Sequence, residues 1–412
     1  MEALPRIMLA AALAGLASAG LHAQAADGPP AGNEAAAKLK PIAAPAQPAA
    51  PDALPLGKLR LPSGFRIEVY ASGMPDARTL RVGSRGTVFV ASPASSKVYA
   101  IDGQRTVKVI ASGLHRPNGL AFRDGTLFIA EVSRISKIDN VENALDNPPK
   151  PTTVYEDLPK GEVNGLRYLA VGPDGKLYVS VGMPCNNCLP QSAEAQIRRI
   201  DLQGNNVEAV ALGVRNSLGF DWSPQSKQLY FTDNGRDWLS EDAPNDELNR
   251  IAKPGENFGA PFCYQGTLPD SEFGWGHSCD EFTPPIALLG PHVAPLGMRF
   301  YTGRMFARDY RDAIFVARHG SWNRTKKIGG DVVAVHLNKS GTVDSMEPFL
   351  TGFIADNNYL GRPVDVEQMQ DGSLLISDDW NGAVYRVMSR GREQAQEPQH
   401  ERRRRRFFYD FR

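Results

Sequence analysis

A group of polar residues with chemical uses lies within residues 214–261, beside two short hydrophobic runs at 218–222 and 228–232. The connection after the second run is dense in charged and amide side chains: Asp233, Asn234, Arg236, Asp237, Glu241, Asp242, Asp246 and Glu247. Oxygen-rich sets of this kind suit a hard cation such as Ca²⁺. A solvated acidic loop would have the same composition, so both interpretations stay open at this point.

The elements that must position these groups are short strands. A unit in which a short apolar strand leads to a Gly/Asp turn and then to a more hydrophobic strand recurs six times, at residues 81–101, 119–138, 169–200, 218–251, 297–335 and 364–387. Four of the turns are explicit, at 123–125, 172–175, 223–226 and 370–372, where Gly, Asp or Pro supplies the backbone geometry of a tight hairpin.

Long helical periodicity is nearly absent, and the unit spacing matches four-stranded blades with variable loops. We therefore predict an all-β fold, a six-bladed β-propeller over residues 59–390. The run at 65–71 precedes the first unit, and we expect it to complete the last blade and so close the ring without exposed edges. A pair of β-sandwiches is the alternative, but it would not explain six similar units.

The two ends of the chain differ from this body. Residues 1–25 resemble an export signal, because Arg6 precedes an apolar run and Ala23-Gln24-Ala25 offers a small-x-small cleavage site. Retention of this run as an uncleaved anchor is the alternative. Residues 26–58 are rich in Ala and Pro and predict a disordered tether. Residues 391–412 predict a basic disordered tail.

Four cysteines occur, as Cys185 with Cys188 and as Cys263 with Cys279. An exported chain meets an oxidising compartment, so we expect a periplasmic or secreted protein with two local disulfides. A zinc site is the weaker interpretation, because the second pair lacks tight spacing. A thioredoxin-type redox motif is also disfavoured, because no βαβ pattern surrounds Cys185.

The charge balance bears on the kind of partner. Basic and acidic residues number 46 each in the 412-residue chain. This balance removes a global electrostatic argument for nucleic acid and favours a small neutral ligand. Beyond the first 25 residues no stretch is apolar enough to span a bilayer, so no stable membrane span is expected.

Several motifs in this order resemble the glucose/sorbosone dehydrogenase family: RNSLGF, DNGRD, DELN, NFGAPFC, VGPDGKLYVSVG, CNNC, RHGSWNR and GRPVDV. The resemblance runs from about residue 61 to residue 387. It implies a six-bladed propeller that uses pyrroloquinoline quinone (PQQ) and Ca²⁺. It also implies oxidation of an aldose or sorbosone-like sugar at the anomeric carbon, followed by electron transfer to an acceptor that the sequence does not identify.

The resemblance also assigns roles to residues. Arg215 matches an arginine placed over the quinone oxygens, where a fixed cation would stabilise charge that develops on reduction, and Asn216 adds a hydrogen bond. The backbone carbonyls of Gly235 and Arg236 match the pair that holds calcium, with Asn234 beside them. Arg362 matches an arginine that pairs with a cofactor carboxylate.

One departure concerns the catalytic base. The family has a histidine just upstream of the GPDG strand, whereas this chain has Asn164 at that position, and asparagine is no base near neutral pH. The proton then goes to His292 or His319, or the chain binds its ligand without efficient turnover. If the missing base limits the rate, Asn164→His should raise turnover.

Other interpretations therefore stay open. A lone histidine is more often a hydrogen-bonded structural residue, and Trp322 could wall a sugar or stack near the quinone, although a Trp on a blade is most often core. A calcium-dependent lactonase of the gluconolactonase type would share the scaffold, and residues 117–122 resemble a motif of such enzymes. A non-catalytic binding propeller is the third hypothesis, because fold alone does not choose among functions.

Overall fold

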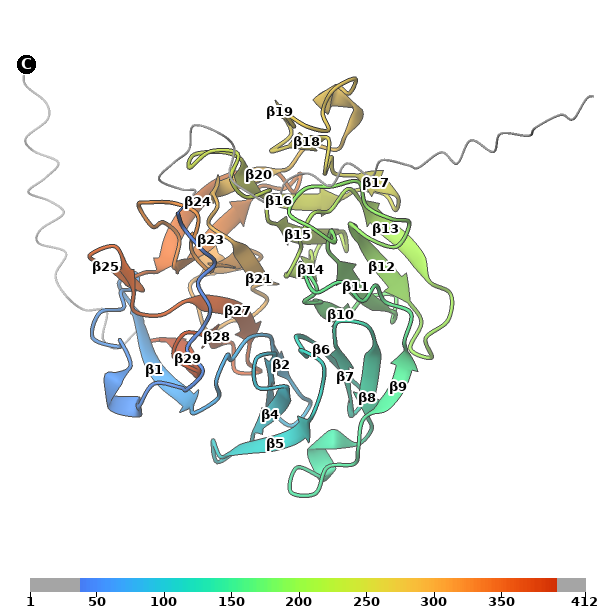
Figure 1. Cartoon of the computed structure of the whole chain (residues 1–412). Helices are drawn as coiled ribbons and strands as arrows, with labels where there is room; N and C mark the ends of the chain where they lie inside the picture. Colours follow the sequence, from blue (N-terminus) through green and yellow to red (C-terminus); the bar gives the residue numbers. More distant parts are fainter. Residues whose placement is uncertain (1–37, 391–412) are drawn as a thin grey trace, which may run out of the picture.

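A computed structural model describes residues 38–390, and short strands make up nearly all of its regular structure. Six sheets surround a central axis, which confirms the predicted six-bladed β-propeller (Figure 1). Within residues 38–390 the helical elements are four single turns of 3₁₀ helix, η1 (Pro51–Ala53), η2 (Val141–Asn143), η3 (Cys279–Glu281) and η4 (Arg308–Tyr310). This part of the chain contains no helix long and apolar enough to cross a membrane.

Each of the first three blades is an antiparallel sheet, and its strands are named in order from the axis outward. Blade 1 contains β2 (Leu80–Val82), β3 (Val88–Ser92), β4 (Lys97–Ile101) and β5 (Val107–Ser112). Blade 2 contains β6 (Gly119–Arg123), β7 (Thr126–Ala130), β8 (Ile135–Ile138) and β9 (Thr152–Tyr155). Blade 3 contains β10 (Leu169–Val171), β11 (Leu177–Val181), β12 (Gln196–Ile200) and β13 (Glu208–Leu212), and β17 (Glu256–Asn257) adds a parallel edge.

The remaining blades follow the same order. Blade 4 contains β14 (Phe220–Trp222), β15 (Leu229–Asp233), β16 (Asn245–Ile251) and β20 (Ala287–Pro291). Blade 5 contains β21 (Pro295–Phe300), β22 (Ile314–Arg318), β23 (Asp331–Leu337) and β24 (Val343–Leu350). Blade 6 contains β27 (Pro363–Gln368), β28 (Leu374–Asp378), β29 (Ala383–Ser389) and β1 (Phe65–Ser72). Two small hairpins pair β18 (Cys263–Tyr264) with β19 (Leu268–Pro269) and β25 (Ile354–Ala355) with β26 (Asn358–Tyr359).

The ring closes through its N-terminal strand, as predicted. β1 pairs antiparallel with β29, from Phe65 opposite Ser389 to Ser72 opposite Ala383. The outer edge of blade 6 is therefore supplied by a segment some 300 residues away in sequence. This pairing joins the two ends of the folded body, so the ring does not open at an unpaired edge.

The six predicted units capture the three inner strands of each blade but mostly miss the outermost strand. The reason lies in burial. The inner strand β3 is buried along its whole length, whereas β24 is exposed at five of its eight positions. Outermost strands face solvent on more than one side, so their hydrophobic pattern is weak and sequence periodicity does not reveal them. The four predicted hairpin turns lie between first and second strands, as expected.

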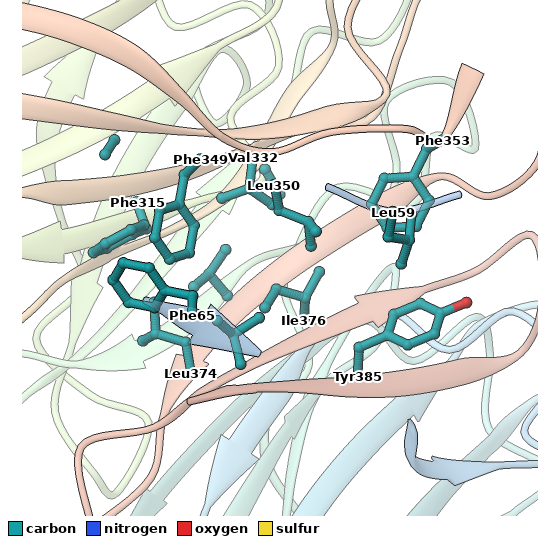
Figure 2. Close-up of a cluster of buried hydrophobic side chains, with 14 of the residues drawn as sticks. Leu59, Phe65, Phe315, Val332, Phe349, Leu350, Phe353, Leu374, Ile376 and Tyr385 are labelled. Atoms are coloured by element: carbon teal, nitrogen blue, oxygen red, sulfur yellow. The ribbon is translucent and has the colours of Figure 1, made fainter. Parts of the chain in front are cut away.

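Six hydrophobic clusters fill the six spaces between neighbouring blades. Figure 2 shows the cluster between blades 5 and 6, where Phe65 of β1 packs edge-on against Phe349 of β24 with ring centroids 5.1 Å apart. Leu374 and Ile376 of β28 approach the same cluster from the blade 6 side. The cluster therefore buries the closing strand together with both sheets.

Glycines begin several inner strands because neighbouring backbones approach closely near the axis. A Cβ at Gly119 would lie 2.8 Å from the backbone nitrogen of Leu169 on the next inner strand. A Cβ at Gly219 would lie 2.8 Å from Cα of Gly297. A side chain at either position would push the blades apart.

The predicted tether behaves differently in the part that the structure describes. Leu54 and Leu59 are buried in the cluster between blades 5 and 6, and the backbone nitrogen of Ala49 donates to Asn381 at 2.9 Å. Scattered leucines in an Ala/Pro-rich stretch are enough to dock it onto an apolar surface, and the carbonyl of Ile42 accepts a bond from Arg362, so the segment from about residue 42 onward is part of the folded body. The predicted signal, the first part of the tether and the basic tail lie outside the described residues.

Candidate active site

A cavity of about 170 Å³ lies at the end of the axial channel where the first strands begin and the second strands end. Antiparallel neighbours bring these two kinds of terminus to one end of the ring. The cavity combines cations, amides, carboxylates and one indole: Arg78, Asn164, Arg215, Asn216, Asn234, Gly235, Asp237, Asp246, His292, Ala294, Leu296, His319, Trp322 and Asn323. The sequence-predicted residues other than Arg236 and Arg362 thus meet in one place.

The opposite end of the channel has a different character. A larger hollow of about 470 Å³ opens there among the hairpin turns, but it contains none of the predicted site residues. Above it, Arg81 pairs with Glu367 at 2.9 Å, and Arg299 also pairs with Glu367. These buried pairs occupy the axis between the inner strands, so the chemistry is concentrated in the smaller cavity.

The position directly after the second strand of a blade carries a polar residue at the cavity end of the ring in three of the blades. β15, β22 and β28 end at the same rim of the ring, and the residues that follow them are Asn234, His319 and Asp379. The strand ends are held by their own polar residues. In blade 4, the carboxylate of Asp233 accepts the backbone N–H groups of Arg215 at 2.9 Å and Asn216 at 2.7 Å. This capping fixes the incoming loop and directs the next residue toward the axis.

His319 is paired with a buried carboxylate. Its Nε2 lies 2.9 and 2.8 Å from the two carboxylate oxygens of Asp379, and Nη1 of Arg78 donates to the same carboxylate at 2.5 Å. Burial, followed by the charge of Arg362, lowers the pKa of His319 to about 4. Burial would raise the pKa of Asp379, but His319 and Arg78 outweigh it and lower that pKa to about 2.

The imidazole is therefore neutral at neutral pH. A neutral imidazole carries one N–H, and the Asp379 carboxylate only accepts, so the proton sits on Nε2. Nδ1 is then left as an acceptor, and no residue in the described range bonds it. His319 lines the cavity, and its unbonded Nδ1 is a nitrogen that can accept a proton, which the amide of Asn164 cannot do.

Arg78 is a second cation of the cavity that the sequence analysis did not identify. It is buried, and its Nε donates to Oδ1 of Asn118 at 3.2 Å while Nη1 bonds Asp379. No described residue bonds its Nη2. A guanidinium with an unused edge at the wall of a cavity suits a carboxylate or a quinone oxygen.

Arg215 lines the cavity as predicted, but protein acceptors hold its guanidinium. Nε donates to the carbonyl of Asn186 at 2.8 Å, Nη2 donates to Oδ1 of Asn186 at 2.8 Å, and Nη1 donates to the carbonyl of Asn234 at 3.1 Å. A 3.3 Å bond joins Nη2 to Asp237. Arg215 is thus a rigid cation whose position depends on the loop that carries Asn186.

The predicted amides and calcium ligands lie around it. Nδ2 of Asn234 donates to the carbonyls of Asn216 at 2.8 Å and Pro295 at 3.3 Å, whereas no described residue bonds the side chain of Asn216. Gly235 lines the cavity and donates its N–H to Asp246 at 2.8 Å. No described donor occupies the carbonyls of Gly235 or Arg236.

The side chain of Arg236 points to a different neighbour. It donates to Asp270 at 2.7 Å and to Glu272 at 3.3 Å, and it is absent from the cavity lining. Arg236 can therefore serve the cavity through its backbone alone, which is the role that the resemblance assigned to it.

Arg362 does not line the cavity. Its guanidinium donates to the carbonyls of His319 at 3.3 Å, Gly320 at 2.8 Å and Ile42 at 2.9 Å, and it lies over the ring of Tyr359. All of its edges are used by protein groups, so here it supports the loop behind His319. The predicted pairing with a cofactor carboxylate finds no free edge in this geometry, and Arg78 is better placed for it.

Asn164 and His292 are both engaged in local structure. Nδ2 of Asn164 donates to the carbonyls of Met183 and Cys185, each at 3.1 Å. Nε2 of His292 donates to the carbonyls of Ser240 at 2.7 Å and Ala243 at 3.1 Å, and burial lowers the pKa of His292. Neither has the free nitrogen that His319 offers.

Trp322 lines the cavity and meets Trp238 edge to face, with ring centroids 5.3 Å apart. Its position beside the cavity favours a wall for a ring-shaped ligand over burial inside a blade.

Both predicted disulfides are present, Cys185 with Cys188 and Cys263 with Cys279. The first closes the loop that carries Asn186, which holds Arg215. The second closes a loop that contains Asp270, which accepts bonds from Arg236 at 2.7 Å and from Asn187 at 3.1 Å. One stapled loop therefore holds Arg215 at the cavity, and the other holds the side chain of Arg236 outside it.

The residues present fit PQQ and a divalent cation. PQQ carries carboxylates and quinone oxygens, and the unused Nη2 of Arg78 and the side chain of Asn216 offer donors that such groups need, while Arg215 adds a fixed positive charge. Unused carbonyl oxygens at Gly235 and Arg236, near the carboxylate of Asp246, match the oxygen ligands of Ca²⁺. Burial raises the pKa of Asp246 to about 7 and outweighs the N–H groups of Gly235 and Ala294 and the charge of Arg215, which lower it.

Several of these residues escaped the sequence analysis: Arg78, Asp379 and Asn323. Asp379 could have been found from the repeated position after the second strand, because it aligns with His319 and Asn234 in that scheme. Arg78 and Asn323 lie in loops whose spacing carries no such signal.

Comparisons with known proteins agree with this description. A model of the family described as TrAA12-like matches residues 59–390. A Borreliella burgdorferi protein described as an uncharacterized protein is 34% identical over an alignment of 345 positions that covers 80% of this chain and 90% of that protein. A pyrroloquinoline quinone-dependent pyranose dehydrogenase of Coprinopsis cinerea is 32% identical over an alignment of 120 positions that covers 24% of this chain and 16% of that enzyme.

Solved structures share the fold. The holo form of the PQQ domain of pyranose dehydrogenase from Coprinopsis cinerea superposes with a TM-score of 0.70 at 19% identity, over 80% of this chain and 97% of that chain. The PQQ-bound form of aldose sugar dehydrogenase from Streptomyces coelicolor has a TM-score of 0.59 at 19% identity, over 80% and 99% of the two chains.

Proposed function

The chain belongs to the TrAA12-like family of PQQ-dependent sugar dehydrogenases, and from that membership we propose that it oxidises an aldose or a sorbosone-like sugar at its anomeric carbon. As a member of that family it is an oxidoreductase of the quinoprotein class. The observation that carries the proposal is the His319–Asp379 pair at the wall of the cavity, because it provides a base where Asn164 replaces the expected histidine.

The division of labour follows from the geometry. When bound, PQQ supplies the acceptor for the hydride that leaves the sugar carbon. Nδ1 of His319 takes the proton of the hydroxyl on that carbon, so the oxygen forms a double bond to carbon as the hydride departs. Asp379 holds the imidazole in the tautomer that leaves Nδ1 free and stabilises the imidazolium that forms. Arg78 holds Asp379 in turn.

The cofactor would be held by the two cations of the cavity. Arg78, through its unused Nη2, and Asn216 would donate hydrogen bonds to anionic oxygens, and Arg215, whose N–H groups are held by protein acceptors, would contribute its positive charge. The carbonyls of Gly235 and Arg236 would hold Ca²⁺, with Asn234 positioning this turn through its bond to Asn216. Trp322 would form a wall against a flat ring.

We also propose a periplasmic or secreted location, in which a small sugar is the substrate and a separate acceptor receives the electrons. The two disulfides suit an oxidising compartment. The predicted export signal gives the same expectation from the sequence.

The test is reconstitution. Purified protein, freed of metal with a chelator, is mixed with PQQ and Ca²⁺ and followed by quinone absorbance and by melting temperature, and aldoses are then offered with an artificial electron acceptor. We expect a stoichiometric absorbance change, a higher melting temperature and dye reduction that requires both additions. PQQ binding without dye reduction for any aldose would refute the dehydrogenase assignment and favour a binding propeller. Lactone hydrolysis without PQQ binding would favour the lactonase.

A further inference from the structure

Asn323 has a buried oxygen that no described residue satisfies. The residue lies in the loop between β22 and β23 and is only 2% exposed. Its Nδ2 donates to Oδ1 of Asp237 at 2.9 Å and faces Nδ1 of His292 at 3.3 Å. Its Oδ1 is buried without a hydrogen-bond partner. A buried acceptor of this kind normally has a partner, so its isolation points to a ligand.

The orientation of this amide is fixed by two neighbours. Nε2 of His292 faces the carbonyls of Ser240 and Ala243, so it must carry the proton, and Nδ1 is left as a lone pair. Asp237 offers a carboxylate oxygen. Both groups that face the amide nitrogen of Asn323 are therefore acceptors, and a flipped amide would place oxygen against oxygen and nitrogen lone pair. The orphaned oxygen thus follows from the network.

Two backbone donors of the cavity are already used. The N–H groups of Gly235 and Ala294 are taken by Asp246, each at 2.8 Å. The carboxylates of Asp237 and Asp246 and the backbone of Gly235 share the cavity with Asn323. A sugar hydroxyl could satisfy this oxygen alone, whereas a cation also uses the neighbouring carboxylate and carbonyl oxygens. A set made of carboxamide, carboxylate and carbonyl oxygens matches Ca²⁺.

We propose that Oδ1 of Asn323 is a ligand of the divalent cation, together with the carboxylate of Asp246 and the carbonyl of Gly235. The inference rests on the proposed function only for the identity of the cation, and it adds two side-chain ligands to the backbone carbonyls that the family resemblance supplied. Asn323 thereby connects the blade 5 loop that carries His319 to the blade 4 turn at Gly235 and Arg236, where the resemblance places Ca²⁺.

The site can be tested without PQQ and without turnover. Chelator-treated protein is titrated with Tb³⁺, whose luminescence Trp322 in the cavity wall should sensitise, and Ca²⁺ is then used to displace it. Calorimetric titration with Ca²⁺ gives the affinity directly, and Mg²⁺ serves as the competing ion. We expect single-site Ca²⁺ binding, weaker Mg²⁺ binding and displacement of Tb³⁺ by Ca²⁺.

Two variants and one control separate the ligand role from a folding role. Asn323→Ala should weaken Ca²⁺ binding by about 10- to 100-fold, the range seen when a metal site loses a supporting group. Asn323→Asp keeps an oxygen but sets a second carboxylate against Asp237, so its melting temperature should be lower without metal and rise more with Ca²⁺ than that of the wild type. Asn164→Ala, which changes another asparagine of the cavity, should leave Ca²⁺ affinity unchanged.

Some results would overturn the inference. Wild-type affinity in a folded Asn323→Ala variant would remove Asn323 from the ligand set. Loss of monosaccharide binding in that variant, without Ca²⁺ binding in the wild type, would assign the oxygen to a sugar hydroxyl. If Ca²⁺ binds as expected but PQQ does not, the metal site stands and the proposed dehydrogenase function fails.

Discussion

Replacing His319 with glutamine should abolish the proton acceptor and leave the site assembled. The Gln side chain retains an N–H that can donate to Asp379, so the loop of blade 5 and the Arg78 pair are expected to stay in place. General-base catalysis contributes about 10²- to 10⁴-fold, and we expect a loss of this size in kcat/KM. PQQ affinity, measured by absorbance, should change little.

The pH dependence gives an independent signature. The pKa of His319 is about 4, lowered chiefly by burial, so His319 is neutral and competent above that value and the rate should fall as pH drops through about 4. An unperturbed histidine would instead lose activity near its usual pKa of about 6.5. Wild-type kcat/KM is therefore expected to stay level from neutral pH to about pH 5 on its acid side.

The lowered pKa of His319 also makes the free energy of unfolding depend on pH. The pKa of His319 is lower in the folded protein than in the unfolded chain. Its contribution is therefore fully present above about pH 6.5 and is lost as pH falls toward about 4. A difference of about 2.5 pKa units corresponds to about 3 kcal/mol. Between pH 7 and pH 4, the free energy of unfolding of the wild type should fall by about 3 kcal/mol more than that of His319→Gln. Denaturant titrations at both pH values measure this difference.

The matched control is His336→Gln, a histidine of β23, the third strand of blade 5, that contacts Glu347 at 3.3 Å away from the cavity. It should keep wild-type kinetics. Turnover at the wild-type level in His319→Gln, or an unchanged acid limb in that variant, would show that the proton goes elsewhere and that the His319–Asp379 pair is structural.

Three further predictions concern the framework of the site. Asn164→His should not raise turnover, because the new side chain cannot bridge the carbonyls of Met183 and Cys185 and His319 already supplies the base; a faster enzyme in steady-state assays would restore the view that position 164 limits the rate. Replacing both Cys185 and Cys188 with serine should weaken PQQ binding in absorbance titrations and lower the melting temperature only slightly, because that loop holds Arg215 through Asn186. Unchanged PQQ affinity would contradict this link. Phe65→Ala should cost about 3–5 kcal/mol in denaturant unfolding, because it opens a cavity under the closing strand; a much smaller cost would mean that β1 is not needed for ring closure.

Much of the fold could be predicted from the sequence because the signals are local. Turn residues such as Asp124-Gly125 and Gly175 mark hairpins through their left-handed backbone, and short continuous hydrophobic runs mark the inner strands. The outermost strands escaped because solvent reaches them, as the exposed β24 shows. Docking of the segment around Leu54 escaped as well, because a single apolar residue in a Pro-rich stretch carries no periodic pattern.

The candidate site divides in the same way. Arg215, Asn216, Asn234, Gly235 and His319 could be nominated because they sit in recognisable motifs beside strand ends, and the structure brings all five to one cavity. The partners that set their chemistry could not be nominated. Asp379 lies 60 residues from His319 in sequence and 301 residues from Arg78, yet it bonds both.

The sequence by itself determined six repeated sheets, a closing strand, two local disulfides and the segments from which chemistry could come, because strands, turns and short-range pairs depend on neighbours along the chain. The tertiary structure alone decided which functional groups are free. In the packed ring, the guanidinium of Arg362 donates to backbone carbonyls, whereas Nδ1 of His319 has no partner among the described residues. Oδ1 of Asn323 is buried without a hydrogen bond. Those outcomes depend on hydrogen-bond partners contributed by other blades, and linear spacing contains no record of them.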